Sequence, residues 1–376
     1  MDDGIVDVPI LNIKDADPES MQLALCMYAQ HVWCDGSLYC RRIKGSTIKT
    51  YVRDAALLLF KASRNFLDYR KDTPFQDAMG HHLTAIYANI DKYEKAVKRR
   101  EAFTLPMLDE ALARAKLAPW QDHIDEVLAD WYVVGLRAGL RKVEWAQPED
   151  RQFDPDFPHK NLYGDAYAFC MNDIKVKLRD GTILMGYACL GTPSNPIDAS
   201  MVAELWICFK QQKNGENGEW RQYTVWMLDT LRCMVHTMYR IMRRFVRLRG
   251  WNDTKTPLSV FAASRYGQVH LVHAKKIMDS MRSIAAKVHK FNPKKDHDKL
   301  RRWSSHSLRV GACVLLFESG YNEVQIQWLL RWKSTAFMDY LRNTISLAKK
   351  HAGILSRPFG RGDAMPNLNL VAPPSA

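Results

Sequence analysis

The sequence predicts a mainly α-helical protein with small β-hairpins, an α+β fold class. Three stretches, residues 21–97, 104–145 and 227–350, show a helical pattern of apolar and polar residues. Between them, two shorter stretches alternate with the period of two that is typical of strands, around turn-forming residues. The chain has 376 residues, of which 47% are hydrophobic. It is therefore long enough for two domains and can bury a sizeable core.

The expected domain boundary follows a dense basic run, Lys92 to Arg100, which we interpret as a linker. Thr104 is a candidate N-cap, and Pro106 falls in the first turn of a new helix, where its missing N–H costs little. We therefore divide the chain into a loose N-terminus (1–20), a helical domain (21–103), a second domain (104–350) and a tail rich in Pro, Gly and Asn (351–376).

Two β-hairpins are expected inside the second domain. The first runs through Asp173–Leu178 and Thr182–Met185, around the turn signal Asp180-Gly181. The second runs through Glu204–Phe209 and Trp220–Val225, around a turn rich in Asn and Gly.

Charge and cysteine content limit the function. The formal net charge is +13 and the pI is about 9.3. A balance this basic favours a polyanionic partner, and nucleic acid is the commonest one. The eight cysteines show no C-x-x-C spacing, so we expect no structural zinc, and their apolar context favours a reducing, intracellular compartment. The acidic N-terminus is unlike a secretory signal, and no apolar run is long enough to cross a membrane.

The strongest functional signal is an ordered set of residues near the C-terminus. His306 and Arg309 are three positions apart, so on a helix they lie on one face, one turn apart. The set continues with the small residue Gly311, the turn Gly320-Tyr321, Trp332 and Tyr340. This order resembles the catalytic signature of the tyrosine recombinase and integrase family. Trp332 stands where most members of that family have a second histidine, as it does in Cre-like members.

The same family has a further arginine upstream, in the pattern G-L-R-x-x-E. Arg141 matches it fully, because it follows Gly139-Leu140 and precedes Glu144. Arg137 is the alternative, although it matches only the first half of the pattern.

The family also has a lysine on a β-hairpin. Lys213, beside the turn of the second predicted hairpin, fits that context best. Lys210, Lys175 and Lys177 stay open as alternatives.

The resemblance implies an enzyme that cleaves and rejoins DNA strands through a 3′-phosphotyrosine intermediate, without metal, ATP or another cofactor. Tyr340 would be the nucleophile and Lys213 the general acid. The remaining members of the set, Arg141, His306, Arg309 and Trp332, would stabilise the transition state. Residues 21–103 would then be a DNA-clamping domain, and 104–350 the catalytic domain.

The partner implied is double-stranded DNA, held by a homotetramer on paired sites. A transposable element is a plausible origin for such an integrase. The protein would act wherever its DNA is, in the nucleus or in the nucleoid and cytoplasm. Two other functions stay open: a catalytically inactive, DNA-binding descendant of a recombinase, and a type IB topoisomerase.

One further stretch, Leu231 to Arg249, is predicted as an amphipathic helix with an apolar and a basic face. Its basic face consists of Arg240, Arg243, Arg244 and Arg247. These arginines would either contact DNA phosphates, which we favour slightly, or form an ordinary solvated face.

Overall fold

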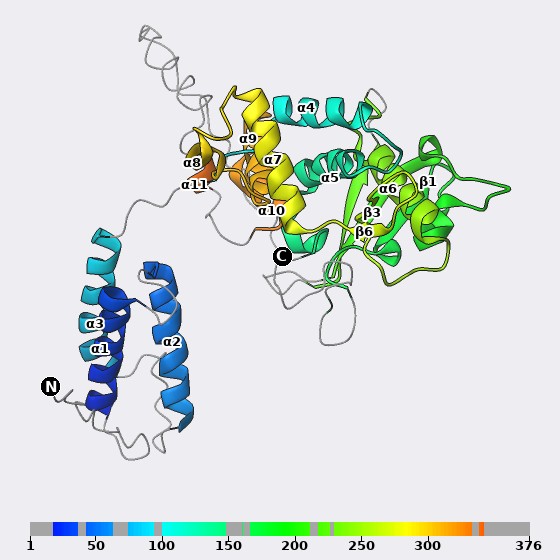
Figure 1. Cartoon of the computed structure of the whole chain (residues 1–376). Coiled ribbons are helices and arrows are strands. Elements are labelled where there is room, and N and C mark those ends of the chain that lie inside the picture. Colours follow the sequence, from blue (N-terminus) through cyan, green and yellow to red (C-terminus); the bar gives the residue numbers. More distant parts are fainter. Residues whose placement is uncertain are drawn as a thin grey trace, which may run out of the picture. The chain divides into compact units, whose positions relative to one another are not determined.

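The computed structural model describes residues 18–36, 43–62, 74–93, 100–147, 160, 166–210, 217–225, 229–332 and 338–341. The chain forms two compact units that divide between Lys98 and Arg99 (Figure 1). The predicted tail, 351–376, lies outside the described residues. No helix in the described ranges is both long and apolar enough to span a membrane.

The first unit is helical. Its helices are α1 (Pro18–Asp35), α2 (Gly45–Ala62) and α3 (Pro74–Tyr93). Each contributes to one small core, whose fully buried members are Leu25, Ala29, Val32, Ile48, Val52 and Ile90. An ion pair between Lys49 and Asp91, 2.7 Å long, also links α2 to α3. α1 begins at Pro18, three residues before the predicted start, and proline is well tolerated at a first helical position.

The second unit is built around one buried helix. Its helices are α4 (Leu105–Lys116), α5 (Ile124–Ala138), α6 (Met234–Arg249), α7 (Ala274–Val288), α8 (His297–Leu300), α9 (Ser307–Glu318), α10 (Glu323–Leu330) and α11 (Met338–Leu341). α5 is apolar around most of its circumference, and Trp131 and Tyr132 are completely buried, as in a helix packed on several sides. Thr104 is the N-cap residue of α4, as the sequence predicts, although its side chain makes no capping hydrogen bond.

The unit boundary lies before the predicted residue 104 for a structural reason. The N–H of Glu101 donates to the carbonyl of Arg302, and that of Phe103 donates to the carbonyl of Ser307. Residues 101–103 therefore run beside the segment that leads into α9 and belong to the second unit.

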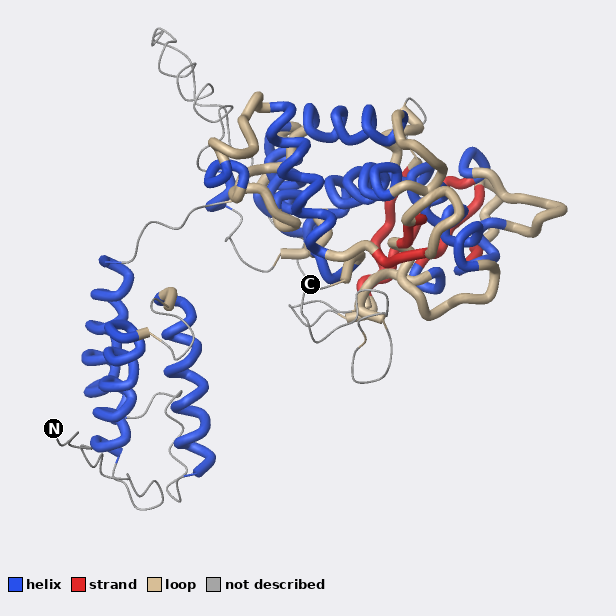
Figure 2. The backbone as a smooth tube through the Cα atoms, in the orientation of Figure 1, coloured by secondary structure: helices blue, strands red, loops and turns tan. Residues whose placement is uncertain are grey.

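The two predicted hairpins are confirmed, and they pair with each other. The strands β1 (Ile174–Leu178), β2 (Ile183–Met185), β3 (Val202–Phe209) and β4 (Glu219–Thr224) form one antiparallel sheet in the order β2-β1-β3-β4. The sheet lies toward one side of the unit, whereas α7, α9 and α10 gather toward the other (Figures 1 and 2). The β1–β3 pairing joins residues about thirty positions apart, which local sequence patterns do not reveal.

The helical pattern predicted from residue 227 does not hold between α6 and α7. The strands β5 (Val260–Ala262) and β6 (Val269–Leu271) form a second, two-stranded sheet. Each strand has only three residues, and β5 is buried on both faces. Such a short strand shows no alternation, so its pattern cannot be distinguished from that of a buried helix.

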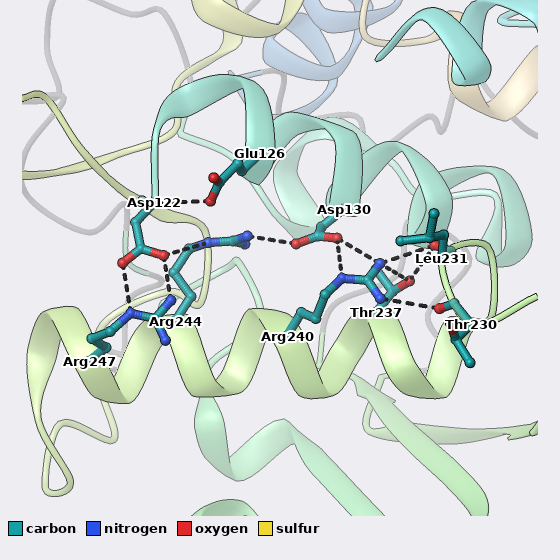
Figure 3. Close-up of polar contacts among 9 residues, drawn as sticks. All are labelled: Asp122, Glu126, Asp130, Thr230, Leu231, Thr237, Arg240, Arg244 and Arg247. Carbon is teal, nitrogen blue, oxygen red and sulfur yellow. Dashed lines mark hydrogen bonds and ion pairs between the residues drawn. The ribbon is translucent and has the colours of Figure 1, made fainter. Parts of the chain in front are cut away.

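A ladder of ion pairs joins α5 and the loop before it to α6 (Figure 3). Arg244 is only 5% exposed and lies between two carboxylates, 2.7 Å from Asp130 and 3.3 Å from Asp122. Arg240 donates to Asp130 at 2.9 Å, and Arg247 donates to Asp122 at 2.9 Å. We call these five residues the α5–α6 ladder.

The ladder contradicts the favoured sequence-based role for Arg244, the most buried of the four arginines on the basic face of α6. Arg244 is too buried to reach a phosphate, and Arg240 also donates to the carbonyls of Thr230 and Leu231. Arg243, the fourth arginine of this face, pairs with Asp198 at 3.4 Å. All four arginines therefore have partners within the unit, while Arg243 and Arg247 keep 45% and 43% of their side-chain surface exposed.

Breaking the ladder should destabilise the second unit. Asp130→Asn leaves two arginines, one of them buried, without their shared carboxylate, and we expect the free energy of unfolding to fall by about 3 kcal/mol. Urea denaturation followed by tryptophan fluorescence measures this change, because Trp131 and Trp145 lie in the core of the unit. The matched control is Asp298→Asn, which breaks an exposed pair with Arg301 and should cost less than about 0.5 kcal/mol. Equal effects of the two variants would contradict this account.

Candidate active site

The C-terminal end of α5 places Arg141. Gly139 follows the helix with φ +58° and adopts the left-handed conformation that ends many helices. A Cβ atom at this position would lie 2.5 Å from the Cδ2 atom of Leu330, so the turn also requires the absence of a side chain. Arg141 comes two residues later and begins a short 3₁₀ helix, η1 (Lys142–Glu144).

A buried carboxylate holds Arg141. Glu144 is only 4% exposed. Its Oε2 atom accepts the backbone N–H of Arg141 at 2.7 Å, and its Oε1 atom accepts the Nη1 donor of the Arg141 side chain at 3.3 Å. The Arg141 side chain keeps 24% of its surface exposed. Arg137, the alternative, lies in the last turn of α5 with an exposed side chain.

The start of α9 carries His306 and Arg309. His306 is the exposed N-cap residue of this helix, and Arg309 lies one turn later with only 5% of its surface exposed. The Nη1 atom of Arg309 donates to the carbonyl of Gly139 at 2.7 Å, and its Nη2 atom donates to the carbonyl of Leu330 at 3.0 Å. Arg309 therefore joins the C-terminal ends of α5 and α10, where helix carbonyls lack partners within the helix.

The small residue Gly311, part of the sequence signature, has a packing role. A Cβ atom at this position would lie 2.2 Å from the carbonyl oxygen of Phe103 and 2.9 Å from Leu136. Only glycine therefore lets α9 approach the segment before α4 and the side of α5.

The end of α10 carries Trp332. The helix stops at Arg331, which adopts a left-handed conformation with φ +59°. The backbone N–H of Trp332 donates to the carbonyl of Gln327 at 2.9 Å. The guanidinium carbon of Arg309 lies 4.8 Å from the centre of a Trp332 ring. This distance fits a cation–π contact. Trp332, Arg309 and His306 thus share one region at the ends of α5, α9 and α10.

Tyr340 lies in α11, and its side chain is outside the described part of the structure. The next residue, Leu341, is 3% exposed and packs in a small apolar cluster with Ala312, Ile326 and Leu330. This cluster joins α11 to α9 and α10, so the backbone of Tyr340 lies beside the helices that carry Arg309 and Trp332.

The hairpin lysines differ in their surroundings. Lys213 lies outside the described residues. Lys210 at the end of β3 forms a 2.7 Å ion pair with Asp173. Lys177 pairs with Glu204 at 3.4 Å, and the Lys175 ammonium lies 3.9 Å from the centre of the Trp220 ring. All three alternatives therefore already have partners within the sheet region.

Electrostatics at the start of α9 favour a neutral imidazole. The pKa of His306 lies below its ordinary value of 6.5, chiefly because neighbouring atoms desolvate the ring. The positive charges of Arg309 and Arg100 lower it further. At neutral pH the ring therefore offers one N–H donor and one acceptor.

Sequence reasoning passed over Arg331, whose buried side chain contacts Glu144. Local sequence patterns contain no signal for this contact, because Glu144 lies 187 positions away. No group of three or more His, Cys, Asp or Glu residues in the described ranges is arranged to hold a metal ion.

Comparison with known proteins finds similarity among solved structures only. No protein-family model and no curated protein sequence matches the chain. The integrase of the transposon Tn1549, in complex with circular intermediate DNA, is 12% identical over 90% of this chain and 86% of its own, with a TM-score of 0.40. The XerH site-specific recombinase, bound to a palindromic difH substrate, is 12% identical over 91% of this chain and 73% of its own, with a TM-score of 0.41.

The lowered pKa of His306 can be measured by NMR titration of its imidazole ring. We expect a value below 6.5, and Arg100→Gln should raise it because one of the two nearby positive charges is removed. Arg265→Gln is the control, since Arg265 is exposed in the turn between β5 and β6. A wild-type pKa of 6.5 or more, or an equal response to both substitutions, would count against this description of the site.

Proposed function

We propose that the chain is a tyrosine recombinase that cleaves and rejoins DNA strands through a covalent 3′-phosphotyrosine at Tyr340. The strongest support is that Arg309 contacts two other parts of the site. It donates to the carbonyl of Gly139, two positions before Arg141, and its guanidinium lies over the Trp332 ring. Arg141 and Trp332 are 191 positions apart in sequence (332 − 141), yet these residues occur in the order of the family signature and lie around the same helix ends.

The positive charges would act on the phosphodiester. Negative charge on the phosphate repels a nucleophile, and guanidinium groups oppose this repulsion with fixed, directional donors. Arg141, partly exposed and held by Glu144, would bind a non-bridging oxygen. Arg309 is more buried, so it would act mainly through its charge in a region of low dielectric constant. His306 and the indole N–H of Trp332 would add hydrogen bonds to the pentacoordinate transition state.

The covalent step would exchange one ester bond for another. The Tyr340 oxygen attacks phosphorus and loses its phenolic proton, while the bond to the 5′ oxygen of the departing strand breaks. Lys213 would donate a proton to that oxygen as general acid. In the reverse step, a 5′ hydroxyl of a partner strand attacks the phosphotyrosine and releases Tyr340. The phenolic proton passes to solvent water and Lys213 regains its proton from water, so the scheme balances with groups of the chain, the DNA and water.

The proposed function also involves the first unit and further copies of the chain. The helical unit of α1, α2 and α3 would clamp duplex DNA together with the second unit, with residues 21–103 and 104–350 as the two functional domains. A homotetramer on paired sites would exchange the strands. An intracellular protein of a transposable element fits this chemistry.

The nucleophile can be tested with a pool of DNA duplexes that carry random sequence on both sides of one nick. Cleavage beside the nick releases a short fragment and traps the covalent adduct. We expect the wild-type chain to form an adduct that survives denaturing electrophoresis, and Tyr340→Phe to form none, because a phenyl ring has no nucleophile. The matched control is Tyr266→Phe, since Tyr266 is 92% exposed on the turn between β5 and β6 and should not matter.

The outcomes separate the candidate functions. If the wild-type chain binds DNA but forms no adduct, the protein is a catalytically inactive, DNA-binding descendant of a recombinase and not an enzyme. An adduct that persists in Tyr340→Phe would refute the assigned nucleophile. Relaxation of any supercoiled plasmid by dilute monomer would favour a type IB topoisomerase.

The general acid can be tested by changing the leaving group. Lys213→Ala should slow adduct formation by about 100-fold, which is typical for loss of a general acid. A duplex with sulfur in place of the 5′ bridging oxygen should restore the rate, because a thiolate leaves without protonation. Lys210→Ala is the comparison, and we expect no such restoration because Lys210 pairs with Asp173. Restoration in Lys210→Ala instead would transfer the role to Lys210.

A further inference from the structure

Arg331 has an unusual backbone conformation for its residue type. Its φ of +59° lies in the left-handed region, where a residue with a side chain is disfavoured by about 1 kcal/mol or more. Among the described residues outside glycine, only Asp122 and Lys290 share a positive φ. Glycine would fit this helix end more easily, so the Arg331 side chain must contribute something that offsets the backbone cost.

The Arg331 side chain is entirely buried among specific partners. None of its surface is exposed. The Nη2 atom donates to the carbonyl of Ala138 at 3.1 Å, and the guanidinium carbon lies 3.3 Å from the centre of the Phe209 ring. Arg331 therefore touches α5 and β3, and it cannot itself bind DNA because no part of its side chain reaches the surface.

The same side chain shares a carboxylate with Arg141. The Oε1 atom of Glu144 accepts Nη1 of Arg331 at 3.4 Å and Nη1 of Arg141 at 3.3 Å. The Oε2 atom accepts Nη2 of Arg331 at 3.4 Å and the backbone N–H of Arg141 at 2.7 Å. Each oxygen of one buried carboxylate is thus bound by both arginines.

A neighbouring phenol leaves this charge arrangement unchanged. Burial raises the pKa of Tyr223 on β4 to about 12, although the charge of Arg331 opposes the rise. Tyr223 therefore stays neutral at physiological pH. The buried charge of Glu144 is balanced by Arg331, and Arg141 remains as the partly exposed positive charge of the cluster.

We propose that Arg331 is a positioning residue of the site. Through Glu144 it fixes the guanidinium of Arg141, and through the chain it fixes Trp332, the next residue. As a contribution to catalysis this rests on the proposed recombinase function, but the contact itself is open to a separate test. It adds a buried arginine to the set of residues that the sequence signature names.

Hydrogen exchange measured by mass spectrometry tests the contact without DNA. In Arg331→Gly, the backbone suits the left-handed conformation while Glu144 loses its buried partner. We expect faster exchange in a peptide that covers residues 139–147, because the Arg141 N–H bond to Glu144 is loosened. The matched control is Arg244→Gln, which removes another buried arginine, from the α5–α6 ladder. Because this change destabilises the whole unit, it should speed exchange in that peptide no more than in the rest of the unit.

The contribution of Arg331 to catalysis is tested by the rate of adduct formation at saturating DNA. The substrate is a nicked duplex whose sequence has been recovered from the random pool. Arg331→Gly should lower this rate by about 100-fold per folded molecule, since small displacements of a catalytic group cost that much. DNA affinity should change by less than about threefold. Arg244→Gln should leave the rate of the folded molecules unchanged. Arg331→Lys, which keeps the charge but not the two-pronged donor, should fall between wild type and Arg331→Gly.

A double-mutant comparison guards against a variant that fails to fold. Glu144→Gln should lower the same rate, and adding Arg331→Gly to it should have little further effect, because both act through one contact. If Arg331→Gly does not fold, Arg331→Lys takes its place in both measurements. Unchanged exchange at residues 139–147, or equal losses of rate in the Arg331 and Arg244 variants, would overturn the proposal. A wild-type chain that forms no adduct would refute the recombinase function instead, while the exchange result would still decide the role of Arg331.

Discussion

The candidate site depends on guanidinium groups that bind the carbonyl ends of helices. α5 and α10 both end where Arg309 can donate to them, at Gly139 and Leu330, and Arg331 donates to Ala138 beside the first of these. Terminal helix carbonyls lack partners within the helix and carry a partial negative charge, so buried cations are favourable there. The turns that follow the two helices carry Arg141 and Trp332, and the same contacts therefore fix the helix ends and the site.

At the start and in the middle of α5, arginines bind carboxylates instead of helix carbonyls. Asp122 precedes the helix and Asp130 lies on it, and together they bind three arginines of α6 (Figure 3). Some arginines stabilise the unit, and their burial and carboxylate partners distinguish them from Arg141, which keeps part of its surface exposed.

Sequence patterns predicted the local structure well and the distant pairings poorly. The helices, both hairpins and the N-cap Thr104 follow from patterns within a few residues. The role of Arg244 was missed because its partners lie more than 110 positions away. Arg331 gave no signal for the same reason, since Glu144 is 187 positions distant. The order of the signature predicted that Arg141, His306, Arg309 and Trp332 lie near one another, whereas the catalytic roles of all six site residues stay predictions. The side chains of Tyr340 and Lys213 lie outside the described part.

The burial of Arg309 changes how the signature itself should be understood. An arginine that bridges two helix ends and stacks on Trp332 cannot be removed without disturbing the fold around the site. Loss of activity on replacing Arg309 would therefore not distinguish stabilisation of the transition state from loss of the site's architecture. Arg141 and His306 are different, since both keep exposed surface. Under the proposed function, kinetic effects at these two positions would report on the chemistry, whereas those at Arg309 would combine charge stabilisation with loss of the surrounding framework.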